Sequence, residues 1–231
     1  MKKKQLFFIV TILVTVVNLN AMDGVITGKE VGIDLGLEYN RVFNFCGDLA
    51  ATGSMELFNR YTFKTGLSFG GVKKSLDFKY FFSGQMEILP GTGFCFSLAY
   101  IYNGITGFHT HSHSLFPCLS WYGKRAGISA GTNLRFNRFY GEFFSFESMI
   151  SFSVYVNFLL RENLKAGFRI ANFSEFNAGN MGAYNLAVYS GISINENWSF
   201  NGEAVLMQSG SVGLGTAFYG IAFRAGMRYV W

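Results

Sequence analysis

The only histidines of the chain, His109, His111 and His113, lie close together in the segment Phe-His-Thr-His-Ser-His-Ser. In an extended strand, side chains two residues apart point to the same side, so this spacing would put all three imidazoles on one face. Neutral imidazoles bind zinc, copper and nickel, and the spacing predicts a candidate metal site. The alternative is a solvated loop. No carboxylate lies within ten residues on either side, so no local general base is predicted.

A Gly-x-Ser-x-Gly pattern spans residues 127–131, with Ser129 as its serine. This motif supplies a nucleophile only where a strand turns sharply into a helix and a histidine and an acid converge on the serine. Here the motif lies inside a strand-like run, and the histidines are all in one distant cluster. We therefore predict no catalytic residues, no enzyme activity and no cofactor beyond the candidate metal.

Three cysteines, Cys46, Cys95 and Cys118, are an odd number for a chain in an oxidising compartment. At most one disulfide could form. Two of the three lie in strand-like runs, where a small apolar side chain is the expected role.

The composition is unusual for a soluble protein. Half of the residues are hydrophobic, 14% are charged and 18% are aromatic, with 27 Phe and 12 Tyr. Typical soluble proteins carry roughly 25% charged residues. A chain of 231 residues without a linker-like stretch is expected to form one domain.

Residues 1–21 resemble an export signal. Lys2, Lys3 and Lys4 form a basic start, the apolar core runs from Leu6 to Val17, and Ala21 is a small residue suited to cleavage. A retained helical anchor is the alternative, but the core is shorter than the roughly 20 residues that span a bilayer. Removal of the three lysines lowers the net charge from +5 to +2, which removes the compositional support for nucleic-acid binding.

The rest of the chain, residues 22–231, alternates between apolar and polar positions. From Glu30 to Arg41, apolar residues at 31, 33, 35, 37 and 39 alternate with small or charged ones, and similar runs cover 54–69 and 146–160. Further runs cover 76–88, 93–103, 114–122, 126–137, 164–173, 183–194, 198–208 and 217–231. The pattern predicts an all-β fold, a single antiparallel transmembrane β-barrel.

The number of strands is left as a range. These runs number eleven, whereas single-chain bacterial barrels have an even number of strands. We expect 10 to 12 strands, with 8 as an alternative, and place the ambiguity between residues 70 and 123. Connections in the second half are expected to alternate in length: those at 124–125, 161–163 and 195–197 are short, and those at 137–144, 173–182 and 208–216 are longer.

The C-terminal run ends on an aromatic residue. Counting back by twos from Trp231 gives Tyr229, Met227, Ala225, Phe223 and Ile221, which are all apolar. This pattern resembles the last strand of outer-membrane β-barrel proteins, and the whole chain resembles small porin-like outer-membrane proteins of diderm bacteria. The resemblance implies integral location in the outer membrane, contact with its lipid, and recognition of Phe223, Tyr229 and Trp231 by the barrel-assembly machinery.

If the apolar positions face lipid, the other positions face the lumen. Charges of both signs are then expected inside, with a basic excess: Asp34, Glu38, Glu56, Arg60, Lys64, Asp77, Lys79, Arg135, Lys165, Arg169, Glu203, Arg224 and Arg228. Aromatic residues near the ends of the runs are expected in the girdles at the membrane interfaces: Tyr39, Tyr100, Tyr102, Trp121, Tyr122, Trp198, Tyr229 and Trp231.

The first and last strands of a closed barrel are neighbours. Their charges predict two inward ion pairs at this seam, Asp34 with Arg228 and Glu38 with Arg224. The alternative is that barrel shear offsets the two strands and gives these charges other partners.

Two functions fit these features. The first is a small porin or channel for passive passage of small solutes, lined by the inward charges with a modest preference for anions. The second is a non-conducting barrel whose external loops act in adhesion or surface interaction.

Overall fold

The computed structural model describes residues 26–40, 44–72, 75–105, 110–140, 142–173, 183–211 and 215–231. No helix among these residues is long and apolar enough to cross a membrane. The described residues form twelve strands: β1 Ile26–Asn40, β2 Asn44–Leu57, β3 Tyr61–Val72, β4 Ser75–Leu89, β5 Phe94–Ile105, β6 Thr110–Tyr122, β7 Ala126–Phe139, β8 Glu142–Arg161, β9 Leu164–Ala171, β10 Ala183–Ser193, β11 Trp198–Ser211 and β12 Gly215–Val230.

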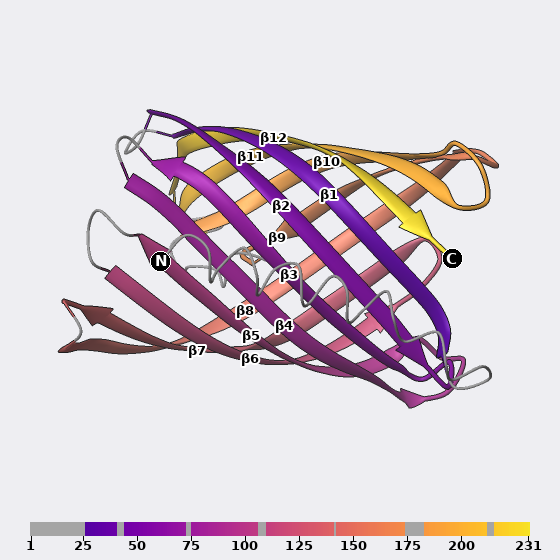
Figure 1. Ribbon diagram of the computed structural model, residues 1–231, viewed down its shortest axis with the longest axis horizontal. Coiled ribbons are helices and arrows are strands. Elements are labelled where there is room, and N and C mark those ends of the chain that lie inside the picture. The colour runs from indigo at the N-terminus through magenta and orange to yellow at the C-terminus, as the bar shows by residue number, and fades with distance from the viewer. Residues whose placement is uncertain are drawn as a thin grey trace, which may run out of the picture.

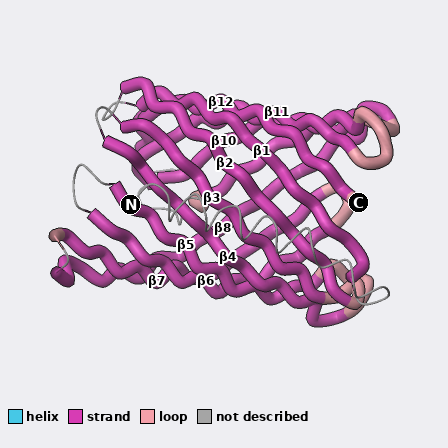
Figure 2. The backbone as a smooth tube through the Cα atoms, in the orientation of Figure 1, coloured by secondary structure: helices cyan, strands magenta, loops and turns pink. Residues whose placement is uncertain are grey.

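The twelve strands close into one antiparallel barrel (Figures 1 and 2). Each strand pairs with its neighbours in the chain, and β12 pairs with β1. The start of β1 and the end of β12 meet at one end, where the Trp231 amide donates to the Lys29 carbonyl. In single-chain barrels this end faces the periplasm, so the opposite rim is external.

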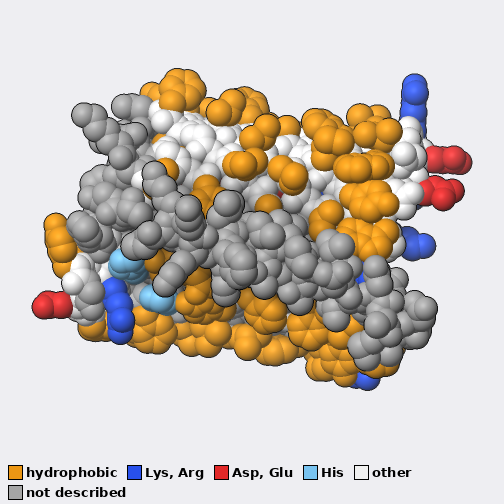
Figure 3. All heavy atoms as spheres, in the orientation of Figure 1, with side chains coloured by type: hydrophobic (Ala, Val, Ile, Leu, Met, Phe, Trp, Pro, Cys, Tyr) orange, Lys and Arg blue, Asp and Glu red, His pale blue; other side chains and the backbone are white. Residues whose placement is uncertain are grey.

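The outer surface of the barrel is apolar (Figure 3). On β1, Ile33, Leu35 and Leu37 each expose more than 60% of their surface, and Phe223 on β12 exposes 54%. In water such a surface would be unfavourable, whereas lipid solvates it and closure leaves no unpaired strand edge. An apolar exterior on a closed β-barrel is the arrangement of an integral outer-membrane protein.

The expected alternation is present, and the twelve strands lie within the expected range of 10 to 12, whereas the alternative of 8 strands is wrong. The sequence runs nevertheless numbered eleven, so one strand was missed. The missed strand is β2, because the run predicted at 54–69 contains the end of β2, a turn and most of β3. The turn holds Phe58 and Asn59 at φ values of 54° and 50°, without the glycine or proline that normally marks such a turn. The ambiguity therefore lay before residue 70 and not between 70 and 123.

Two of the three connections expected to be long are short. β7 ends at Phe139 and β8 begins at Glu142, and β11 and β12 are separated by residues 212–214 alone. The strands extend past the last clear alternation because pairing with a neighbour continues the ladder. Only the connection between β9 and β10 exceeds ten residues.

At the seam, the register is offset by two residues from the predicted one. Asp34 lies opposite Gly226, and Arg228 lies opposite Gly32. The predicted Asp34–Arg228 pair is nevertheless confirmed, because the long guanidinium reaches diagonally, with Nη1 and Nη2 at 2.9 and 2.8 Å from the two carboxylate oxygens. The predicted Glu38–Arg224 pair is wrong, since Arg224 instead lies 3.9 Å from Asp48 on β2.

The Asp34–Arg228 pair is expected to stabilise the closed barrel. It is bidentate and partly buried, so Arg228→Gln should lower the free energy of unfolding by about 1–3 kcal/mol. Urea unfolding in lipid vesicles measures this loss. Asp34→Asn should cost a similar amount, and the double variant should cost less than the sum. Strictly additive losses would contradict an energetic coupling between the two residues.

Candidate functional site

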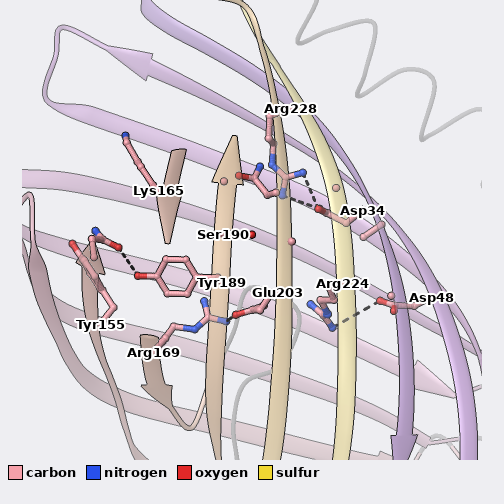
Figure 4. A pocket seen from close by; sticks show the side chains of 17 residues that line it. Asp34, Asp48, Tyr155, Lys165, Arg169, Tyr189, Ser190, Glu203, Arg224 and Arg228 are labelled. Carbon is pink, nitrogen blue, oxygen red and sulfur yellow. Dashed lines mark hydrogen bonds and ion pairs between the residues drawn. The ribbon is translucent and has the colours of Figure 1, made fainter. Parts of the chain in front are cut away.

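The lumen contains a charged cavity of about 520 Å³ (Figure 4). Its lining comes from seven neighbouring strands of the wall, β8 to β12 and, across the seam, β1 and β2. Four cationic and three anionic side chains line it: Lys165, Arg169, Arg224 and Arg228 with Asp34, Asp48 and Glu203. All seven except Asp48 were predicted to face the lumen. The cavity therefore has a small basic excess.

Ion pairs hold most of these charged groups along the wall. Besides the Arg228–Asp34 pair, Arg169 Nη2 pairs with Glu203 Oε1. Among the described residues, no acidic side chain forms an ion pair with Lys165, which is exposed at the start of β9. Lys165 is thus the cation most available to a solute.

Glycines opposite the large inward side chains keep the cavity open. Gly226 lies directly across from Asp34, and Gly36 lies across from Asp48. A Cβ atom on either glycine would overlap the opposing carboxylate, so each carboxylate lies flat against the neighbouring strand. The same arrangement places Tyr155 over Gly127 and Tyr189 over Gly167. Side chains that lie against the wall leave the centre of the lumen free.

A smaller cavity of about 330 Å³ lies along the wall formed by β3 to β9. It begins at residues near the periplasmic end, including Thr62 and Tyr122, and shares Tyr155 and Arg169 with the charged cavity. Four large apolar residues also line it: Phe81, Ile101, Phe116 and Phe173. We call these four residues the lumenal apolar cluster.

The lumenal apolar cluster crosses part of the lumen. The rings of Phe116 on β6 and Phe173, just beyond β9, are 4.6 Å apart although two strands separate their positions in the wall. Between β6 and β9, Asn133 on β7 and Ser151 on β8 are almost fully buried. The contact between the two rings explains this burial, because it bridges the wall segment that carries the two polar side chains.

Asn172 fixes the position of Phe173. Its side-chain oxygen accepts a hydrogen bond from the Phe152 amide at 2.8 Å, and its Nδ2 donates to the Ile150 carbonyl at 2.9 Å. The Asn172 side chain therefore makes the hydrogen bonds to the β8 backbone that the backbone of β9 would make if this strand continued. These two hydrogen bonds direct Phe173 into the lumen.

The other predicted charges lie in several places. Lys64 lines the smaller cavity, Lys79 pairs with Asp77 at 2.9 Å, and Arg135 pairs with Glu147 at 3.7 Å. Glu38 and Glu56 lie on the same faces of β1 and β2 as the cavity residues Asp34 and Asp48. The placement of Arg60 in the lumen is wrong, because this residue lies in the exposed turn after β2.

The described histidines are separated from the lumen. His111 and His113 alternate with Phe116, Cys118 and Ser120 along β6, and the latter three line the smaller cavity. The two imidazoles consequently face outwards. Ser129 lines the smaller cavity and so lies on the opposite side of the wall.

The predicted metal site stays a prediction. His109 is outside the described residues, and no group of three or more potential His, Cys, Asp or Glu ligands occurs among the residues that are described. The cysteines Cys46, Cys95 and Cys118 are all free thiols.

The aromatic residues near the strand ends largely face outwards. Tyr229 packs against Trp198 and Trp231 at the periplasmic end, with ring centroids 4.9 and 5.5 Å apart, and Tyr39 contacts Phe45 at the other end. Tyr122 differs from the girdle prediction, since it lines the smaller cavity. Tyr122 ends β6, a strand in which apolar residues lie on both faces, so alternation does not show which way its side chain points.

The two faces of β11 should react differently with thiol reagents. Asn201 lines the charged cavity, whereas its neighbour Phe200 is 42% exposed on the outer surface. In a protein without its native cysteines, Asn201→Cys should be labelled rapidly by a charged, membrane-impermeant reagent in lipid vesicles. Phe200→Cys should resist that reagent and react with an apolar one. Equal labelling by the charged reagent would contradict the assignment of the two faces.

Comparisons with known proteins support the fold. No protein-family model matches the sequence, and no curated protein matches it. A KdgM porin solved in complex with disordered oligogalacturonate is similar in structure, with a TM-score of 0.57 at 10% identity over 86% of this chain and 98% of that one. The NanC porin gives a TM-score of 0.57 at 9% identity over 85% and 98%.

A third similar structure is the COG4313 outer membrane channel from Pseudomonas putida F1, with a TM-score of 0.52 at 9% identity over 92% of this chain and 97% of that one. At identities this low, the similarity shows a shared fold only, and function must be argued from the residues of the site. With its twelve-stranded closed barrel, this chain has the fold of the small porin-like outer-membrane proteins.

Proposed function

We propose that the protein is a channel for passive passage of small solutes, with a modest preference for anions. The observation that carries this proposal is the charged cavity of about 520 Å³ inside the barrel, lined by seven neighbouring strands. A barrel of about 8 strands fills its interior with side chains, whereas 12 strands leave room for a water-filled path.

The sign of the preference follows from the cavity charges. Lys165 lacks an acidic partner among the described residues, whereas each of the three arginines of the cavity lies close to an acidic side chain. A cation beside a narrow water-filled path raises the local concentration of anions. The similar KdgM porin was solved with oligogalacturonate, an anion, and this agrees in sign with the proposed preference.

The adhesion alternative has less support. It requires long external loops, and of the connections at the external rim only the one between β9 and β10 exceeds ten residues. The charged cavity would also have no role in a barrel that only presents loops.

Residues 1–21 and the C-terminal aromatics fit the same proposal. The basic and apolar start of the chain would direct export, and the barrel would be inserted by the assembly machinery through Phe223, Tyr229 and Trp231. Phe223 projects outwards, where a recognition surface could reach it.

Ion selectivity tests the proposed channel. In planar bilayers with a salt gradient, the protein should give discrete current steps with an anion-selective reversal potential. Lys165→Gln should lower the anion-to-cation permeability ratio roughly fourfold, because one unit charge about 10 Å from the path in water changes the concentrations of anions and of cations about twofold each, in opposite directions. Lys124→Gln, in the exposed turn before β7, is the matched control and should change little. A folded barrel that never conducts would contradict the proposal.

The lumenal apolar cluster should limit the current. Phe173→Ala removes the ring that contacts Phe116, so single-channel conductance should rise while the reversal potential stays unchanged. The matched control is Phe168→Ala on β9, whose ring is 55% exposed on the outer surface. An unchanged conductance in Phe173→Ala would show that the narrowest part of the path lies elsewhere.

A further inference from the structure

A polar patch interrupts the apolar outer surface near the external rim. It consists of Tyr80 on β4, Tyr100 and Tyr102 on β5, His111 and His113 on β6, and Arg138 on β7, and we call it the outer His–Tyr patch. Register places its members side by side: Tyr80 opposite Tyr102, Tyr102 opposite His113, and His111 opposite Arg138.

The outer His–Tyr patch faces the membrane and not the lumen. On β5 its tyrosines alternate with Ile101, and on β6 its histidines alternate with Phe116 and Ser120 farther along the strand, all three of which line the smaller cavity. Phe136, opposite His113, is 44% exposed on the outer surface. Figure 3 shows the histidine side chains on this surface near one end of the barrel, with a cationic side chain beside them.

Hydrogen bonds within the patch determine which groups remain available. The Tyr102 hydroxyl lies 2.6 Å from His111 Nδ1, and the Tyr100 hydroxyl lies 2.7 Å from His113 Nδ1. Tyr80 donates to the Tyr100 hydroxyl at 3.3 Å. Because a tyrosine holds Nδ1 of each imidazole, Nε2 is the ring nitrogen that is left for a partner outside the patch. A neutral imidazole that accepts at Nδ1 carries its hydrogen on Nε2.

The patch therefore offers donors and positive charge. The tyrosines do not use Nε2 of either imidazole, which is a donor in the tautomer that accepts at Nδ1, and the exposed residue Arg138 is the cross-strand neighbour of His111. The residue opposite Arg138 on β8 is the aromatic Phe143. Glu142 pairs with Phe139 one position nearer the rim and thus belongs to the other face of the strand.

Such groups need a partner at their depth in the membrane. Polar donors that face hydrocarbon are costly, so their position is stable only where lipid headgroups can accept the hydrogen bonds. His111 is the second residue of β6 and Arg138 the second-last of β7, which puts both at the external ends of their strands. At this level the membrane presents headgroups.

We propose that the outer His–Tyr patch binds the phosphate group of a lipid in the outer leaflet. The phosphate accepts hydrogen bonds from the two imidazole Nε2–H groups and pairs with Arg138, while the acyl chains lie along the exposed apolar residues below. A soluble partner does not fit, because the patch shares its face with the lipid-facing band. The proposal is independent of channel activity.

Native mass spectrometry of protein extracted from the outer membrane of an expressing host tests this site. The protein is offered equal amounts of diphosphoryl lipid A and its dephosphorylated form, and the retained lipid is counted. We expect retention of the phosphorylated lipid to exceed that of the other by about tenfold, the effect of one to two charge-assisted hydrogen bonds. Equal retention of the two lipids would overturn the proposal.

Matched variants locate the site. Arg138→Gln and the double change His111→Phe with His113→Phe should each abolish most of the preference, whereas Arg125→Gln, at the opposite rim, should keep it. Folding is checked by the heat-dependent shift on gels. If the histidine variant does not fold, Arg138→Gln decides alone, since its side chain is exposed. An unchanged preference in Arg138→Gln, or complete displacement of the lipid by millimolar inorganic phosphate, would contradict a lipid site.

Discussion

Inside a bilayer, each backbone N–H and C=O must find its partner within the protein, and in this chain that requirement is met when β12 pairs with β1. The seam sets the stagger of the barrel, and the stagger determines which side chains meet inside. Because the register places glycines opposite Asp34 and Arg228, the two charged side chains reach each other diagonally along the wall. A closed seam, flat-lying ion pairs and an open centre are thus parts of one arrangement.

The two faces of the wall then take different roles. The outer face is mostly apolar, and near the external rim it carries tyrosines and histidines that hydrogen-bond to one another. The inner face combines a charged cavity with the lumenal apolar cluster, which Asn172 holds in place through β8. In the proposed channel, the charged cavity would attract a hydrated anion and the lumenal apolar cluster would limit the width of its path.

Much of this fold was predictable because strict alternation, as in β1, leaves one choice of face for each residue. Prediction failed where that signal was weak. β2 is rich in small residues and ends in a turn that holds Phe58 in a left-handed conformation, so no glycine or proline separates it from β3. Phe81, Ile101 and Phe116 each have a large apolar neighbour in sequence, so periodicity could not show that they point inwards. The histidines were recognised as a cluster, but their outward direction depended on the pairing of β6 with β5.

The register of the seam is the feature that tests this account most directly, and disulfide trapping measures it. In a protein without its native cysteines, Ile33→Cys combined with Met227→Cys should cross-link efficiently under mild oxidation, because these outward positions lie directly opposite each other. Ile33→Cys with Tyr229→Cys, the pair implied by the unshifted register, should cross-link poorly. The reverse result would contradict the seam described here, and with it the glycine-backed ion pairs that keep the lumen open.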